Sequence, residues 1–111
     1  MGQALREGRL VKQGDIIKVS FEAGYRPALV VSNNEFIRRT KLAIVCPITN
    51  TDNDFPLHVP LDTRTATTGV VLCEHVRTLD LQSHKSRFVE RVPDDILKLV
   101  TDIISAEVEI I

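Results

Sequence analysis

One arginine stands out because the residues around it restrict its backbone. Arg26 precedes Pro27, which locks its own φ angle and moves Arg26 out of the helical region, while Gly24 supplies backbone freedom upstream. The guanidinium group is therefore presented from extended chain at the start of a strand. Its planar fork of five donors suits an anion, above all a phosphate. The alternative is a surface arginine that pairs with a neighbouring carboxylate.

Residues that bind hydrolytic metal ions are not clustered in the sequence. Neither carboxylates nor His and Cys residues recur at the spacing that such a site needs. Cys46 and Cys73 lie inside apolar runs, so we expect two small buried side chains without a disulfide, in a reducing compartment. The sequence therefore predicts no metal site.

The overall charge is nearly balanced. The 111 residues include 14 basic and 15 acidic ones, so a contact with nucleic acid would have to use a local basic patch. No apolar run approaches the roughly 18 residues of a membrane span, and no signal segment is recognisable. These features predict a cytoplasmic protein with a flexible arm at 1–13 and a single domain at 14–111.

The spacing of apolar residues predicts several short strands. Residues 14–21 alternate, with Ile17 and Val19 on one face, and a short connection leads into a strand at 28–31 that is buried on both faces. These two strands should form an antiparallel hairpin. Further strands are expected at 42–48, 55–61, 69–73 and 88–92.

Two helices complete the predicted elements. Asn33 can cap a short helix that ends near Thr40. Pro93 precedes Asp94 and Asp95, which suit the first turn of a helix, and apolar residues then recur at helical spacing. The sequence therefore predicts a mainly β fold, a small antiparallel barrel with a C-terminal helix.

Four segments form a combination that is specific to one protein family. They are GDI at 14–16, GYRPALVVS at 24–32, CPIT at 46–49 and TTGVVLCEHVRTLD at 67–80. In these segments, and over nearly the whole chain after Gln13, the sequence resembles the MazF/PemK/Kid family of toxin endoribonucleases, the mRNA interferases of bacterial toxin–antitoxin pairs. The resemblance implies an SH3-like barrel, a fold shared with the gyrase poison CcdB.

The resemblance also implies roles for individual residues. Arg26 and Thr49 match the arginine and the threonine that the family uses on the scissile phosphate, and Glu74 falls where the Kid branch has a functional aspartate. Leu72 falls where that branch has a second functional arginine. Glu22 is a candidate for the contribution that the family draws from its first loop.

These residue types suit cleavage of RNA, which carries its own nucleophile in the 2′-OH group. Arg26 suits charge stabilisation, because a pKa above about 12 disfavours proton donation near neutrality. Thr49 can donate its hydroxyl to a phosphate oxygen; the alternative is a threonine that ties down the loop backbone. Glu74 can act as a base; the alternative is a pair with Arg77. Such a reaction needs no metal and no cofactor.

Six further residues are predicted to bind RNA through basic, aromatic or amide side chains. They are Tyr25, Asn50, Phe55, Arg77, Lys85 and Arg87. Basic groups can follow the RNA backbone and aromatic rings can stack on bases. The alternative is a solvated basic loop. The histidines His58, His75 and His84 receive no role.

The resulting prediction is the toxin of a type II toxin–antitoxin system, a sequence-selective endoribonuclease that cleaves single-stranded mRNA without a metal. The resemblance also implies a homodimer and a cognate antitoxin, and no membrane partner. The alternative is a CcdB-like module that poisons a protein such as gyrase. A third possibility is an RNA-binding domain without activity.

Overall fold

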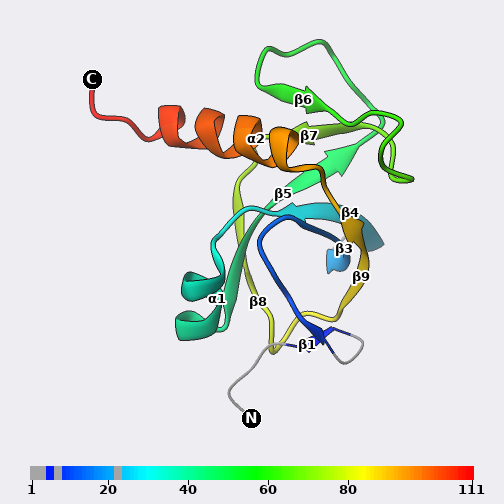
Figure 1. Ribbon diagram of the computed structural model, residues 1–111, viewed down its shortest axis with the longest axis vertical. Coiled ribbons are helices and arrows are strands. Elements are labelled where there is room, and N and C mark those ends of the chain that lie inside the picture. The colour runs from blue at the N-terminus through cyan, green and yellow to red at the C-terminus, as the bar shows by residue number, and fades with distance from the viewer. Residues whose placement is uncertain (1–4, 7–8, 22–23) are drawn as a thin grey trace.

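The structure is a computed structural model that describes residues 5–6, 9–21 and 24–111. Its largest unit is a seven-stranded sheet with a helix against each face (Figure 1). The strands are β1 (Leu5–Arg6), β2 (Arg9–Leu10), β3 (Asp15–Phe21), β4 (Gly24–Val30), β5 (Leu42–Thr49), β6 (His58–Pro60), β7 (Val70–Leu72), β8 (Arg77–Asp80) and β9 (Ser86–Arg91). The helices are α1 (Asn34–Thr40) and α2 (Asp94–Glu107).

The large sheet is antiparallel, as predicted. Its strands lie in the order β6-β7-β5-β4-β3-β9, and β8 also pairs with β5. The hairpin of β3 and β4 sets Ile16 opposite Leu29 and Val19 opposite Arg26. Within the described ranges no pairing joins β9 to β6 or to β8, so the sheet curves like a barrel without closing. The predicted mainly β fold with a C-terminal helix is confirmed.

Both faces of the sheet are apolar because the central strands send alternate residues to each. The inner core contains Val30 and is covered by α1 through Ile37. The outer core contains Leu29 and is covered by α2 through Val100. Leu29 and Val30 are neighbours in the chain and both are fully buried. This confirms that the strand predicted at 28–31 is buried on both faces.

The start and end of α1 follow from local hydrogen bonds. Asn33 caps the helix as predicted, because its side-chain oxygen accepts a hydrogen bond of 2.8 Å from the backbone of Phe36. The helix ends where Lys41 adopts a left-handed conformation with φ of 61°. The hydroxyl of Ser32 accepts a hydrogen bond of 2.9 Å from Ile44 and so links the helix entrance to β5.

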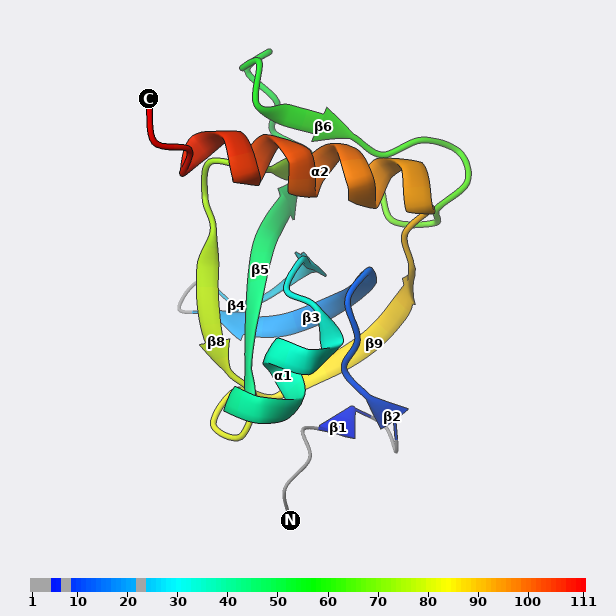
Figure 2. The ribbon, with the colours of Figure 1, turned by 60° about the vertical axis from the view of Figure 1, so that its left-hand side comes forward.

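The helix α2 begins after Pro93, as predicted, and lies across the sheet near β6 and β7 (Figure 2). Ile96 and Val100 anchor it in the outer core. Arg64, in the loop between β6 and β7, donates hydrogen bonds of 2.9 and 3.0 Å to the carboxylate of Asp95 in the first turn. Across the described ranges no helix is long and apolar enough to cross a membrane.

The structure corrects the predicted flexible arm at residues 11–13. Val11 is only 3% exposed and belongs to the inner core. The side-chain amide of Gln13 donates a hydrogen bond of 2.8 Å to the carbonyl of Val31. An apolar side chain in the core and a hydrogen bond to the sheet make these residues part of the fold. Glu22, a candidate from the first loop, lies outside the described residues.

Two strands differ from the prediction. β8 was not expected, because Leu79 is its one buried residue and an exposed strand has no continuous apolar run; pairing with β5 forms it. β6 is shorter than the run predicted at 55–61, since Pro56 and Pro60 have no N–H to donate. Pro47 lies in β5 two residues before the end of the strand.

The two cysteines are free and buried, as predicted. Cys46 lies in β5 and Cys73 follows β7, and both side chains belong to the outer core. They fill space beneath α2 in the manner of small apolar side chains.

We expect Val100→Ala to lower the free energy of unfolding by about 2 kcal/mol, because two buried methyl groups are lost and a cavity remains. Val100 is fully buried under α2, whereas its neighbour Leu99 is 49% exposed. Leu99→Ala is therefore the matched control and should change stability much less. Urea unfolding followed by circular dichroism measures both, and equal losses would mean that α2 is not anchored through Val100.

Candidate functional site

Arg26 lies at the rim of the inner core. It stands in β4 opposite Val19 of β3, and its side chain is exposed. Because side chains alternate along a strand, Arg26 shares a face with Ala28 and Val30, which belong to the inner core. In the part of the chain that the structure describes, no carboxylate forms an ion pair with Arg26. The guanidinium group thus lies exposed at this rim.

Thr49 follows the stretch of β5 that pairs with β4, as Arg26 precedes the matching stretch of β4. These strands pair from Val30 opposite Val45 to Ala28 opposite Pro47. Two residues further along the same register, Arg26 and Thr49 would stand opposite each other on the same face. The pairing of β4 with β5 ends before these two residues, and on its other edge β5 pairs with β7, where Thr49 lies opposite Val70. Arg26 and Thr49 therefore border the place where β4 and β5 separate.

The backbone of Thr49 is held by a close approach of Gly69. Gly69 has φ of +115°, and a Cβ atom there would lie 2.3 Å from the carbonyl oxygen of Thr49. The Thr49 hydroxyl accepts a hydrogen bond of 3.1 Å from the backbone of Thr51. This bond uses a lone pair, so the hydroxyl proton stays available to an oxygen of a ligand. Thr49 thus ties down the loop backbone and can still donate.

A cavity of about 360 Å³ lies next to this rim. Its lining residues are Lys18, Pro27, Asn50, Ala66, Thr67, Thr68 and Val89. Asn50 is held there because its side-chain oxygen accepts a hydrogen bond of 3.0 Å from the Thr68 hydroxyl. The carboxylate of Glu90 accepts hydrogen bonds of 2.7 Å from both the backbone and the hydroxyl of Thr67. These bonds leave the amide group of Asn50 as a donor beside the cavity.

A basic stripe, Lys18 with Lys85 and Arg87, continues from this cavity across the sheet. Lys18 in β3 stands opposite Pro27 on one side and opposite Arg87 on the other. Cavities of about 430 and 580 Å³ follow the stripe, and Tyr25 lines both. Three predicted RNA-binding residues therefore lie together. Lys18 was missed by the sequence analysis, although its position on the polar face of an alternating strand could have indicated it.

Arg77 lies on a different side of β5 from Arg26. It starts β8 opposite Val45, so β5 separates it from β4. The site therefore has cationic side chains on both flanks of β5, with Arg77 away from the basic stripe.

Glu74 is bonded to His58, a residue without a predicted role. The Glu74 Oε2 atom lies 2.8 Å from His58 Nε2, and Asp52 Oδ1 lies 2.9 Å from His58 Nδ1. The His58 side chain is only 6% exposed, and the Phe55 ring contacts it edge-on with 5.5 Å between ring centroids. We call Asp52, His58 and Glu74 the acid–histidine cluster. His75 Nε2 lies farther away, at 3.8 Å from the same Glu74 oxygen.

The hydrogen bonds of the acid–histidine cluster shift its pKa values. The bond to Asp52, followed by the bond to Glu74, raises the pKa of His58 above its usual value. Burial by itself would raise the pKa of Glu74, but the bond to His58 and further attractive interactions hold it below the usual value. The second Glu74 oxygen, Oε1, is buried and has no hydrogen-bond partner among the described residues. No three His, Cys, Asp or Glu side chains of these ranges are arranged to hold a metal ion.

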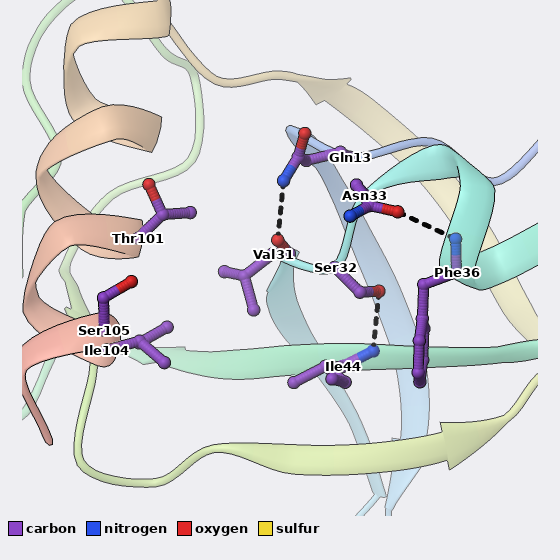
Figure 3. A pocket seen from close by; sticks show the side chains of 9 residues that line it. All are labelled: Gln13, Val31, Ser32, Asn33, Phe36, Ile44, Thr101, Ile104 and Ser105. Carbon is purple, nitrogen blue, oxygen red and sulfur yellow. Dashed lines mark hydrogen bonds between the residues drawn. The ribbon is translucent and has the colours of Figure 1, made fainter. Parts of the chain in front are cut away.

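A separate cavity of about 280 Å³ lies between the two helices and β5 (Figure 3). Thr101 and Ile104 of α2 line one side of it, and Phe36 and Ile44 line the other. The side chain of Gln13 is bonded to a backbone carbonyl at its edge. None of the predicted site residues lines this cavity, so the candidate site is the rim with the basic stripe.

The sequence of residues 12–107 matches the model of one protein family, described as the PemK-like, MazF-like toxin of type II toxin–antitoxin systems. The chain belongs to this family. The match covers the rim, the basic stripe and the acid–histidine cluster of the PemK/MazF toxin, and it confirms the resemblance found in the sequence.

Individual relatives agree with this family. The Escherichia coli protein called Endoribonuclease PemK is 35% identical over 101 residues, which cover 81% of this chain and 76% of the relative. A crystal structure of MazE-MazF from Deinococcus radiodurans has a TM-score of 0.82 at 30% identity and covers 91% of this toxin and 97% of that chain. A mycobacterial endoribonuclease in complex with its cognate antitoxin has a TM-score of 0.78; at 21% identity it supports the fold alone.

We expect Gly69→Ala to perturb the toxin at Thr49, because the added Cβ would lie 2.3 Å from the Thr49 carbonyl and φ is +115°. The loss of stability should be at least about 1 kcal/mol. Gly24 is the matched control, since it also has positive φ but nothing lies within 4 Å of an added Cβ. Thermal unfolding compares Gly69→Ala with Gly24→Ala, and an equal loss would show that the approach to Thr49 costs nothing beyond the backbone angle.

Proposed function

We propose that this toxin cleaves single-stranded RNA at the rim bordered by Arg26 and Thr49. Its membership of the PemK/MazF family and its relative named as an endoribonuclease support this activity. One structural observation supports the location: the register of β4 and β5, extended by two residues beyond its last pair, would set Arg26 opposite Thr49 on one face. A phosphate at this place would meet a guanidinium group and a hydroxyl donor together.

The reaction uses the nucleophile of the RNA. The 2′-oxygen forms a bond to phosphorus, the bond from phosphorus to the 5′-oxygen breaks, and the proton of the 2′-OH leaves as the 5′-oxygen gains one. The products are a 2′,3′-cyclic phosphate and a 5′-hydroxyl. Arg26 stabilises the additional negative charge on the phosphorane, and Thr49 donates a hydrogen bond to a phosphate oxygen. No step requires a metal ion or a cofactor.

Glu74 takes a different role from the proton transfer predicted for it. Its Oε2 atom accepts a hydrogen bond from His58, and its Oε1 atom is buried. A general base must come within hydrogen-bond reach of the proton that it removes. We therefore assign Glu74 to positioning, through His58, and leave Arg26 and Thr49 as the residues that contact the reacting phosphate.

The register places Lys18, opposite Pro27 and Arg87, on the other face of β3 and β4 from Arg26, so the RNA strand passes from the rim across the unpaired edge of β4 to the basic stripe. Lys18, Lys85 and Arg87 contact successive phosphates, and Tyr25 stacks on a base between them. Asn50 donates from its amide group to the nucleotide in the adjacent cavity. Phe55 and Arg77 extend the contact on the other flank of β5. The bases that these residues select determine the cleavage sequence.

The proposed setting of this activity is the cytoplasm, where mRNA is the substrate. The toxin acts as a homodimer, in which a groove across the shared face lengthens the RNA-binding surface. The family description and the solved MazE-MazF relative support an antitoxin as the second partner. A disordered antitoxin tail with acidic and apolar residues would occupy the RNA groove, since its carboxylates mimic phosphate charge.

We expect Arg26→Ala to lower the cleavage rate by about 10²–10³, the effect of removing one preorganised donor to an oxyanion. Arg39, an exposed arginine of α1, supplies the matched control, and Arg39→Ala should cleave at the parent rate. Sedimentation should give twice the chain mass for the parent and both variants.

Cleavage should persist in excess chelator. An RNA with one 2′-deoxy sugar 5′ to the scissile phosphate should bind but resist cleavage.

Mass spectrometry of the fragment ends decides between mechanisms. A 2′,3′-cyclic phosphate agrees with the proposal, whereas a 3′-hydroxyl with a 5′-phosphate, formed only with magnesium, contradicts it. RNA that binds and stays intact would indicate an RNA-binding domain without activity. RNA that neither binds nor breaks would favour a toxin that acts on a protein partner.

We expect a co-expressed antitoxin to inhibit cleavage by competing with RNA for the basic stripe. Gel-shift competition measures this, and Lys85→Ala with Arg87→Ala should weaken binding of both RNA and antitoxin because both ligands are anionic there. Unchanged cleavage in the presence of a bound antitoxin would show that the antitoxin tail does not occupy the RNA groove.

A further inference from the structure

We propose that the acid–histidine cluster is an ionic clamp that holds the loop after Thr49 in its RNA-binding shape and presents Phe55 as a stacking surface for a nucleobase. The inference rests on the proposed function, because it assigns a positioning device to the same RNA site. It gives His58 and Asp52 a role that the sequence pattern did not indicate, and it gives Glu74 a positioning role in place of the base predicted from the sequence.

The clamp joins three separate parts of the chain. Asp52 lies in the loop after β5, His58 begins β6, and Glu74 lies in the turn after β7. The imidazole is bonded at 2.9 Å to Asp52 and at 2.8 Å to Glu74, and its side chain is 6% exposed. The loop is therefore fastened through a nearly buried side chain to the turn that follows β7.

The same groups determine the shape of the loop. Asp52 Oδ1 accepts a second hydrogen bond, of 2.9 Å, from the backbone of Asp54, which has φ of 61°. The backbone of His58 donates a hydrogen bond of 3.0 Å to the carbonyl of Phe55. The Phe55 ring contacts the imidazole edge-on and is still 44% exposed. One side of an aromatic ring is thus fixed by the clamp while another part of it faces solvent, as a base-stacking surface requires.

The charge state of His58 follows from its two partners. Each ring nitrogen faces a carboxylate oxygen, and only the doubly protonated imidazolium donates from both nitrogens. No ring nitrogen is then left to accept a proton, so His58 is a positioning residue and not a general base. The other titratable groups at the cluster are His75, at 3.8 Å from Glu74, and Glu107 of α2, whose pKa is raised by burial and by the charge of Glu74.

The clamp is consequently sensitive to pH. Since the pKa of His58 is raised in the folded chain, chiefly by Asp52 and then by Glu74, the clamp is complete below the ordinary histidine pKa of about 6.5. It weakens as the pH rises through the raised pKa, because the neutral imidazole loses one of its two donated hydrogen bonds. RNA binding should weaken over the same interval.

The test measures KM and kcat for RNA cleavage between about pH 6 and pH 9, across the histidine range. In the parent, KM should rise at the pH where His58 loses its proton. Glu74→Gln retains an oxygen that accepts from His58 but removes a charge, so the rise in KM should move to lower pH. Asp102→Asn removes one carboxylate from the exposed face of α2 and is the control; its midpoint should equal that of the parent.

Phe55→Leu connects the clamp to the nucleobase. It should raise KM at low pH by about fivefold or more, as expected for the loss of one aromatic stack, and should flatten the pH dependence of KM. Imidazole ¹⁵N NMR follows His58 directly and should show both nitrogens protonated below the midpoint of the KM profile. His58→Gln, if it folds, should have a high KM at every pH.

Several results would overturn the clamp. One is a midpoint of the KM profile that Glu74→Gln does not shift. Another is a His58 ring that is neutral below that midpoint. A third is a Glu74→Gln variant that loses kcat at every pH while KM is unchanged, because this would make Glu74 a catalytic residue. If the parent cleaves no RNA, the proposed function fails by itself. Gel-shift affinities measured over the same pH range then replace KM and decide the clamp separately.

Discussion

The end of the pairing between β4 and β5 is the constraint on which the site depends. These strands pair only as far as Pro47 of β5, while the other edge of β5 pairs with β8 as far as Val45 and with β7 from Ile48 onward. Pro47, the last residue of β5 that pairs with β4, has no N–H to donate to a strand ladder. Because the pairing of β4 with β5 ends here, Arg26 and Thr49 border the place where the two strands part. On the other edge of β5, the pairing with β7 positions the turn that carries Glu74.

Three acidic side chains bind local partners. Glu90 binds the loop at Thr67, Glu74 binds His58, and Asp95 binds Arg64. A chain with a net charge of −1 can still present a cationic surface in one region, because charge is distributed unevenly over its surface. The basic stripe and the acid–histidine cluster are two results of this arrangement: one exposes positive charge, and the other uses negative charge to order a loop.

Much of the fold could be predicted because its elements depend on local patterns. The strand buried on both faces is a continuous apolar run, and the cap at Asn33 and the helix after Pro93 depend on residues only a few positions apart. The proposed roles of Arg26 and Thr49 stay predictions that come from one motif each. β8 was not predicted, because a mostly exposed strand forms through pairing with its partner and has no apolar run of its own. The burial of Val11 was not predicted, because it lies among mostly polar residues.

The acid–histidine cluster could not be predicted for a different reason. His58 is 6 residues from Asp52 and 16 from Glu74, and no periodic pattern relates these distances. The three side chains meet only because β6 pairs with β7 and the following turn points back toward the loop. Lys18 could be predicted only in part. The alternating sequence of β3 places it on the polar face, but its neighbours Pro27 and Arg87 come from two other strands.

The two buried cysteines of the outer core are natural probes of the opening of that core. Burial, as the largest cause, raises the pKa of Cys46 to about 12 and that of Cys73 to about 12. A thiol reagent reacts with the thiolate, which is nearly absent at neutral pH while both side chains stay beneath α2. The rate of alkylation of the native chain therefore reports how often the outer core opens to solvent, without any label having been added to the protein.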